Sequence, residues 1–529
     1  MTRKSQNAAC NPVPQRLNTT ALVEAAQSKM SDLVAAHPEW FCTPAGENTQ
    51  ALSRDELDFS VANNRLILNC WSDKGIRTWK IFSWEWSGEK LSLEASRRMG
   101  AERPVIELVP RASAAAIALT VRAARQARCD QLAEFACSVA PGLKVERSSL
   151  SHGARRGQVG PYARIVLRQR NHRIAVTGYV TSSKASDADA FLASALLWFN
   201  RTSERARSPF IDKLWFLLEG AIIKPVIQRI ALLRPTLQDL ITVYEVDKQL
   251  IEASVVQVPT REDLWKKRLA RFPPITADEP DEVTTTVLSM APDAIDVVNA
   301  RHGKTIRYHG LPFARVRQVM GCERLWFGVE GSRRRLLEER TEQEWFDLLH
   351  MLREHRSVAA PDHHNSLYRN AGEAWLESLL RRDITRLDPG LIIAPLYAQF
   401  RISRAGVPGV RPIDLLALRR DGRLTVIELK IFESREHVLQ GVDYWQRVES
   451  HRRRGNITRA RLFGERKIKN EPPLIYLVAP TLRVHPSLTT MAHAIAPDLE
   501  IYRFDINEDW RMGVRVMRRI RINGRLGPS

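Results

Sequence analysis

The strongest constraint on the fold of this chain is a pair of strand-like segments, "IDLLALRR" and "LTVIELK", joined by Asp421 and Gly422. An Asp-Gly pair between two apolar runs is a strong signal for a β-hairpin. Because side chains alternate along a strand, Glu428 and Lys430 share one face of the second segment. An acid and a base in an otherwise apolar strand require polar partners, so this hairpin is a candidate functional site.

The length of the hairpin loop decides which residues face each other. A two-residue turn would place Asp414 opposite Leu429, on the wrong face. A three-residue loop with Gly422 in the left-handed conformation places Asp414 opposite Glu428 or Lys430. We therefore predict an odd-length or bulged loop.

The residue types match metal-assisted cleavage of a phosphodiester. Mg²⁺ prefers carboxylate, carbonyl and water oxygens, and Asp414, Glu428 and the Leu429 carbonyl supply three of them. Such a metal polarises a phosphate and lowers the pKa of its bound water. Lys430 would orient that water or offset the charge that develops on the phosphate.

Two predicted helices flank the hairpin. "RNAGEAWLESLLRR" is amphipathic and carries Glu373, a candidate fourth metal ligand, with Glu377 one turn further on. "REHVLQGVDYWQRVESHRRR" places Gln440 and Tyr444 on one helical face, where they either support the site or, for Tyr444, belong to the core. From Gly372 onward the expected order is helix, three strands, helix, strand, helix, strand.

Residues 359–529 resemble the PD-(D/E)xK nuclease superfamily. In that pattern "PID" supplies the first acid, Asp414, and "ELK" supplies Glu428 and Lys430. "QGVDY" resembles the QxxxY helix of RecB-type members, and the hairpin is similar to NucS-type mismatch endonucleases. The resemblance implies an α/β fold with a restriction-endonuclease-like αβββαβ core, in which helices flank a mixed sheet. It also implies Mg²⁺ or Mn²⁺ as cofactor and DNA as the usual substrate, with RNA not excluded.

Composition is consistent with a polyanionic partner. The chain has 529 residues, a formal net charge of +20 and a pI near 10.0, which favours nucleic acid. Basic runs include "HRRRGNITRAR", "ERKIK" and "RRIRINGR". Each is either a phosphate-binding surface or a solvated basic face.

The remaining features favour a cytoplasmic protein without a membrane segment. The six cysteines form no CxxC pair, so neither a zinc pattern nor a disulfide framework is visible. The first residues are polar and lack an apolar signal core. The most apolar region, "KLWFLLEGAIIKPVIQRIALL", is interrupted by charged residues and proline, which argues against a membrane span.

Low-identity similarity suggests that residues 60–250 and 310–510 repeat one plan at an offset of about 250 residues. Chance similarity between alternating elements is the other interpretation. In a true duplicate, Arg164, Gly178 and Val180 replace Asp414, Glu428 and Lys430, so the first copy is chemically degenerate. Expected domains are a flexible tail (1–55), a small β-rich subdomain (56–110), an α/β domain that is the degenerate nuclease-like copy (111–255), a linker (256–298), a second small β-rich subdomain with a helix (299–358) and the nuclease domain (359–529).

The sequence thus predicts a metal-dependent deoxyribonuclease, expected to be an endonuclease and to serve DNA repair, recombination or defence. The competing hypothesis is a non-catalytic nucleic-acid-binding or assembly protein that retains a nuclease-like fold. The intact set of Asp414, Glu428 and Lys430 favours the enzyme, because binding alone does not need those three residues.

Overall fold

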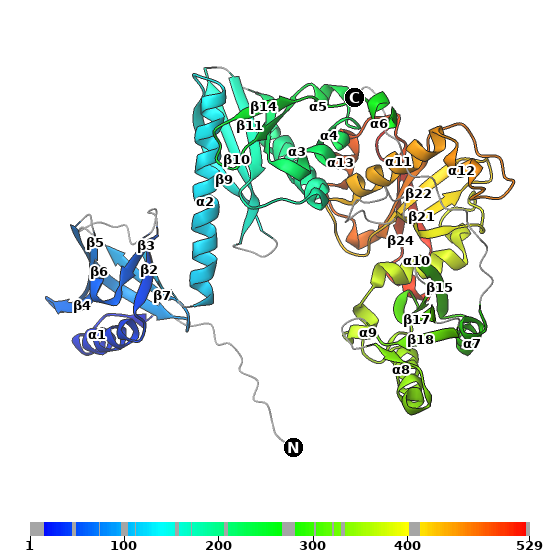
Figure 1. Cartoon of the computed structure of the whole chain (residues 1–529). Coiled ribbons are helices and arrows are strands. Elements are labelled where there is room, and N and C mark those ends of the chain that lie inside the picture. The colour runs from blue at the N-terminus through cyan, green and yellow to red at the C-terminus, as the bar shows by residue number, and fades with distance from the viewer. Residues whose placement is uncertain are drawn as a thin grey trace. The chain divides into compact units, whose positions relative to one another are not determined.

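The computed structural model describes residues 15–44, 49–72, 75–96, 104–111, 113–153, 158–170, 172–205, 210–266, 281–300, 303–319, 322–329, 334–400 and 413–524. The fold is mixed α/β, with several sheets and helices (Figure 1). The chain divides into two compact units. Unit 1 comprises Met1–Glu134 with Ser148–Ala163, and unit 2 comprises Phe135–Arg147 with Arg164–Ser529.

Unit 1 is built on an antiparallel sheet of strand order β3-β2-β8-β7-β6-β5-β4, with β1 paired to β6. Its strands are β1 (Gln15–Arg16), β2 (Glu39–Pro44), β3 (Gln50–Ser53), β4 (Leu57–Ala62), β5 (Arg65–Ser72), β6 (Gly75–Trp86), β7 (Leu91–Ser96) and β8 (Val105–Pro110). Helix α1 (Thr20–Ala35) packs against β4 and β5, and all three elements are blue in Figure 1.

The predicted tail, residues 1–55, was expected to be flexible apart from one short helix. Its described residues contain that helix as α1 and also contain strands β1, β2 and β3. The helix buries Val23, Ala26, Met30 and Val34 in the core of unit 1. Their spacing of three to four residues gives the helix one apolar face, which the sheet covers. Residues 1–14 lie outside the described part of the chain.

The next sheet along the chain has the strand order β14-β13-β12-β11-β10-β9. Its strands are β9 (Lys144–His152), β10 (Val159–Gln169), β11 (His172–Tyr179), β12 (Ile211–Leu218), β13 (Ile241–Val246) and β14 (Ala253–Val256). Helix α2 (Ala114–Val139) precedes these strands along the chain, and α3 (Ala188–Arg205), α4 (Ile223–Ile230) and α5 (Pro235–Gln238) lie between them in sequence. The boundary between the two units falls within α2, β9 and β10. Strands β11, β12 and β13 are parallel to one another, and β14 is antiparallel to β13.

A smaller antiparallel sheet follows, with the order β15-β16-β17-β18-β19. Its elements are β15 (Ile295–Ala300), β16 (Gly303–Tyr308), β17 (Leu311–Val319), β18 (Cys322–Phe327), β19 (Arg335–Leu336), α7 (Glu282–Met290) and α8 (Glu342–His355). The predicted linker, 256–298, contains α7 and α6 (Arg261–Lys266) in its described residues. Trp345 of α8 is buried in this subdomain and stacks on Phe313 at a centroid distance of 5.6 Å.

The last sheet has the order β20-β21-β22-β23-β24-β25. Its strands are β20 (Tyr397–Phe400), β21 (Ile413–Leu418), β22 (Leu424–Leu429), β23 (Leu474–Pro480), β24 (Ile501–Ile506) and β25 (Val516–Arg521). Its helices are α9 (Ser366–Arg369), α10 (Gly372–Arg382), α11 (His437–Arg453), α12 (Asn456–Arg459) and α13 (Leu488–Ala494). Strands β22, β23 and β24 are parallel, whereas β21 and β25 pair antiparallel to β22 and β24.

Strands β21 and β22 are apolar because helices cover both faces of their sheet. Leu415, Ala417, Ile427 and Leu429 join the hydrophobic cluster that contains Trp375 of α10. The alternate residues, including Leu416, Leu418, Leu424 and Val426, join the cluster that contains Tyr444 of α11. Continued alternation places Asp414 and Glu428 on the α11 side, at the open end of the hairpin.

Candidate active site

The hairpin register brings the two predicted acids together. Leu416 pairs with Val426 and Leu415 with Ile427, so the next pair outward is Asp414 with Glu428. The Arg419 N–H donates to the Arg423 carbonyl at 2.8 Å, which leaves a three-residue loop. Gly422 in that loop has a φ of 85°. The prediction of an odd-length loop with a left-handed glycine is therefore confirmed.

Asp414 is held by the neighbouring strand. The Leu429 N–H donates to Asp414 Oδ2 at 2.9 Å. Burial raises the pKa of Asp414 to about 6, although the nearby Lys430 charge opposes that rise. The Asp414 carboxyl thus rests in a site that disfavours its negative charge unless a cation is close.

Glu428 is more deeply buried, with only 1% of its surface exposed. Burial first, and then the charge of Asp414, raise the pKa of Glu428 well above its usual range. Its Oε1 accepts a hydrogen bond from Lys430 Nζ at 2.7 Å, whereas the buried Oε2 meets no hydrogen-bond donor among the described residues. The Asp414 carboxyl lies within hydrogen-bonding reach of Glu428, so either a shared proton or a bound cation would satisfy this oxygen.

Lys430 connects the acids with helix α10. Its Nζ lies 2.7 Å from Glu428 Oε1, 3.1 Å from the Leu429 carbonyl and 3.4 Å from Glu373 Oε2. Burial alone would lower the pKa of Lys430, but the charges of Glu428, Glu373 and Asp414 outweigh burial and raise it. Lys430 is therefore a protonated donor at neutral pH.

The structure separates the two glutamates of α10. Glu373 reaches Lys430 and keeps its side chain 43% exposed. Glu377, one turn later, is buried and pairs with Arg307 of β16 at 3.0 Å. Helix α10 approaches the hairpin closely at Gly372, where an added Cβ would lie 2.2 Å from Ile431 Cδ1. Glu373 is thus the member of the pair that belongs to the candidate site.

The two predicted residues of the QxxxY pattern lie on α11, which packs against β22 and β23. Gln440 donates to Glu436 Oε2 at 3.2 Å, one turn back along the same helix. Tyr444 is buried with Leu416 and Val426, the residues that follow Asp414 and Glu428 inward on the same face. Tyr444 is therefore a core aromatic directly behind the two acids.

Two further residues near Glu428 escaped sequence analysis. His437, at the start of α11, places Nε2 3.2 Å from the Glu428 carbonyl oxygen, and burial lowers the pKa of His437 to about 3. Arg447 lies with its Cζ 5.1 Å from the Tyr444 ring centroid, and burial lowers the pKa of Arg447 to about 9. Glu428 also acts electrostatically on Arg447. Neither residue belongs to a recognisable motif, so only their proximity in the fold reveals them.

The donor atoms suit a hard divalent cation. Asp414, Glu428 and the Leu429 carbonyl offer oxygens on the two strands of one hairpin, and the Glu428 Oε2 that meets no donor offers an additional lone pair. Among the described residues, however, no group of three or more His, Cys, Asp or Glu side chains is arranged to hold a metal. In this arrangement Lys430 takes part of the charge-balancing role, since it contacts Glu428, the Leu429 carbonyl and Glu373.

A second charged feature is positive. We name it the Arg164 cluster, and its members are Arg147, Arg164, Arg201, Arg435 and His485. Burial lowers the pKa of Arg164 to about 10, and the charges of Arg435, Arg201 and Arg147 act in the same direction. Arg164 donates to Ser194 Oγ at 3.5 Å, and Arg435 Nε lies 3.4 Å from His485 Nε2. The cluster joins residues from the region of the β9–β14 sheet, which we call the first half of unit 2, with residues from the region of the β20–β25 sheet, which we call the second half.

The basic runs noted in the sequence have mixed environments. Arg452 and Arg453 both bond to the buried Glu449, and Arg454 donates to the Trp265 carbonyl. This part of the "HRRRGNITRAR" run is therefore engaged within the protein. The basic pair Arg155 and Arg156 lies outside the described residues.

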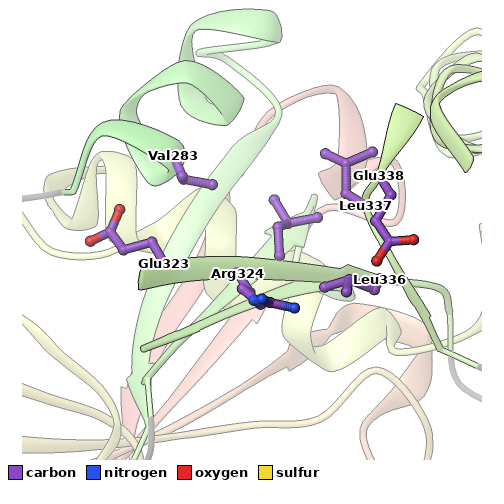
Figure 2. Close-up of a pocket in the computed structure, with 7 residues that line it drawn as sticks. Val283, Glu323, Arg324, Leu336, Leu337 and Glu338 are labelled. Carbon is purple, nitrogen blue, oxygen red and sulfur yellow. The ribbon is translucent and has the colours of Figure 1, made fainter. Parts of the chain in front are cut away.

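A pocket of about 370 Å³ lies in the small subdomain, and its lining side chains come from α7, β18 and the segment around β19 (Figure 2). Its lining contains none of the residues of the candidate site. Within the described residues, every helix is too short or too polar to cross a membrane. Comparison with known proteins finds no matching family model, curated protein or solved structure.

Proposed function

We propose that unit 2 is a metal-dependent nuclease that hydrolyses DNA phosphodiester bonds at Asp414, Glu428 and Lys430. The observation that carries the proposal is the Asp414–Glu428 pair, two desolvated carboxyls on one face of a hairpin with a lysine 2.7 Å away. A structural ion pair needs one acid and one base. Glu428 already has Lys430 as its partner, so burying Asp414 beside it lowers the stability of the fold. Glu428 Oε2 also meets no hydrogen-bond donor among the described residues, and such a costly arrangement is typical of a functional site.

The surrounding architecture supports the same proposal. Elements α10, β20, β21, β22, α11, β23, α13 and β24 follow the order that a restriction-endonuclease-like core has. The two acids lie at the open end of β21 and β22, beside the amino end of α11. DNA rather than RNA follows from the resemblance to the PD-(D/E)xK nucleases, and the Arg164 cluster adds a surface that favours a polyanion.

The chemical roles follow from charge and position. Asp414, Glu428 and the Leu429 carbonyl would hold a Mg²⁺ or Mn²⁺ ion, with Glu373 within reach through its contact with Lys430. A bound cation would polarise the phosphate and acidify a water. Because its neighbours keep Lys430 protonated, we assign it to donate to the attacking water or the phosphate oxygens rather than to remove a proton.

The test is cleavage of plasmid, linear duplex and single-stranded DNA with Mg²⁺, with Mn²⁺ and with chelator. We expect metal-dependent cleavage that falls at least about 100-fold in Asp414→Asn and Glu428→Gln. Glu465→Gln is the matched control, because its side chain is 85% exposed. Cleavage that persists in either site variant would disprove the mechanism. Tight binding of every substrate without cleavage would favour the non-catalytic alternative.

A further inference from the structure

Two of the sheets correspond in strand order and direction. The β9–β14 sheet and the β20–β25 sheet both have six strands in the same relative order, with three parallel strands followed by an antiparallel edge strand. Agreement in order and direction is what an internal duplication produces.

The two halves also meet through a reciprocal contact. Arg234 N donates to the Ala494 carbonyl at 2.9 Å, and Ala496 N donates to the Leu232 carbonyl at 3.1 Å. These bonds flank an antiparallel bridge between Leu233, after α4, and Ile495, after α13. Every antiparallel bridge has this two-fold hydrogen-bond pattern. The informative observation is that its two residues follow α4 and α13, helices at corresponding places in the two halves.

Helix packing obeys the same rule. Helix α3 packs against α13, α11 packs against α4, and α3 and α11 pack against each other. If the halves are exchanged, so that α3 replaces α11 and α4 replaces α13, the α3–α13 contact becomes the α11–α4 contact. The α3–α11 contact then stays the same. Ion pairs reinforce the interface, because Arg229 of α4 lies 3.0 Å from Asp189 of α3 and 2.6 Å from Asp443 of α11. Unit 2 is thus organised like a homodimer within one chain.

Only one half carries the acids. The sequence offset of about 250 residues places Gly178 of β11 where Glu428 stands and Arg164 of β10 where Asp414 stands. Neither glycine nor arginine binds a cation through its side chain. Arg164 is instead grouped with Arg147 and Arg201 of its own half and with Arg435 of the other. Guanidinium groups bind phosphate oxygens through charge-assisted hydrogen bonds. The first half therefore carries a potential phosphate site where the second half carries two carboxylates.

We propose that the chain acts on duplex DNA as an internal pseudo-dimer with a single live centre. It therefore nicks one strand, while the Arg164 cluster of the degenerate half holds the backbone of the strand that is not cut. A symmetric dimeric nuclease presents one centre to each strand, because the duplex backbone has its own two-fold symmetry. Here one of the two centres has become an anion site. This inference rests on the proposed nuclease function and specifies its product.

The first experiment follows supercoiled plasmid with Mg²⁺ at limiting and at excess protein. We expect open-circular DNA as the first product at both concentrations, with linear DNA appearing only later from a second, independent nick. Linear DNA as the first product would overturn the proposal, since it requires two centres acting together. A complete lack of cleavage would instead remove the nuclease function on which the proposal rests.

The second experiment measures binding without catalysis. Duplex and single-stranded oligonucleotides are titrated against the Asp414→Asn protein in chelator, with and without Arg164→Met. We expect Arg164→Met to weaken duplex binding about tenfold, the value of one lost charge-assisted hydrogen bond, and to affect a single strand much less. Arg340→Met is the control, because its side chain is 82% exposed and it lies outside the basic runs and the Arg164 cluster. Equal loss for both oligonucleotides, or no loss, would contradict a role in holding the second strand.

Discussion

Replacing Asp414 with asparagine should stabilise the metal-free protein while it abolishes cleavage. The Asp414 pKa rises from its ordinary value of 3.8 to about 6 because the carboxyl is buried, and the Lys430 charge and the hydrogen bonds to Asp414 only partly offset that rise. The folded state therefore binds the Asp414 proton more tightly than the unfolded chain does. The free energy of folding that this proton contributes is fully present below about pH 4 and is lost as the pH rises through about 6. Asparagine keeps an oxygen for the Leu429 N–H but carries no charge.

The expected gain follows from the same numbers. A pKa difference from 3.8 to about 6 corresponds to about 3 kcal/mol of unfolding free energy above pH 6. Solvent screening of the partly accessible side chain reduces this to about 1–3 kcal/mol. Each kcal/mol raises the melting temperature of a domain of this size by about 2–4 °C. Asp414→Asn should therefore melt several degrees above wild type at pH 8, with a smaller difference at pH 4.5.

The assay is thermal unfolding in chelator at pH 4.5 and pH 8, repeated with Mg²⁺. Added Mg²⁺ should stabilise wild type through mass action and leave Asp414→Asn unchanged, so that the difference narrows. Glu465→Gln should match wild type at both pH values. A gain that is equal at both pH values would show that ionisation of Asp414 is not its cause, and no gain at pH 8 would refute the argument.

Three further substitutions probe other parts of the structure. Lys430→Met should lower the cleavage rate at least about 100-fold. Lys430→Arg should keep part of the rate, because arginine is also a positively charged hydrogen-bond donor. Cleavage rates on a labelled duplex measure both effects. Arg229→Met should lower the unfolding free energy by about 3 kcal/mol, since it leaves Asp189 and Asp443 buried with less compensation; denaturant melts measure this. Gly422→Ala should cost at least about 1 kcal/mol, because φ is 85° and the new Cβ would lie 2.6 Å from the Lys467 carbonyl oxygen; thermal melts measure this.

Matched controls separate these effects from general damage. Lys248→Met removes an exposed lysine and should leave cleavage unchanged. Arg461→Met removes an exposed ion pair and should change stability by less than about 1 kcal/mol. Gly88→Ala has a similar φ of 87° without any close neighbour, so its cost isolates backbone strain from the Gly422 clash. If Gly422→Ala costs no more than Gly88→Ala, the contact with Lys467 is not limiting.

Local sequence was sufficient for the hairpin because its geometry depends on neighbours in the chain. Alternation of side chains and the backbone freedom of Gly422 determine which residues face each other, and the observed register agrees. The order of helices and strands after Gly372 was predictable for the same reason, since periodicity is a local property. Sequence also marked the likeness between the two halves, through the spacing of successive elements.

Contacts between distant segments decided the rest. Glu373 and Glu377 occupy the same helix, and only the packing of α10 shows that the first meets Lys430 while the second pairs with Arg307. Helix α1 packs into the core of unit 1 because a sheet formed largely by later segments covers its apolar face. The reciprocal bonds at Leu233 and Ile495 join residues far apart in the chain. Such contacts arise from chain folding and leave no periodic trace in the sequence, so only the tertiary structure reveals them.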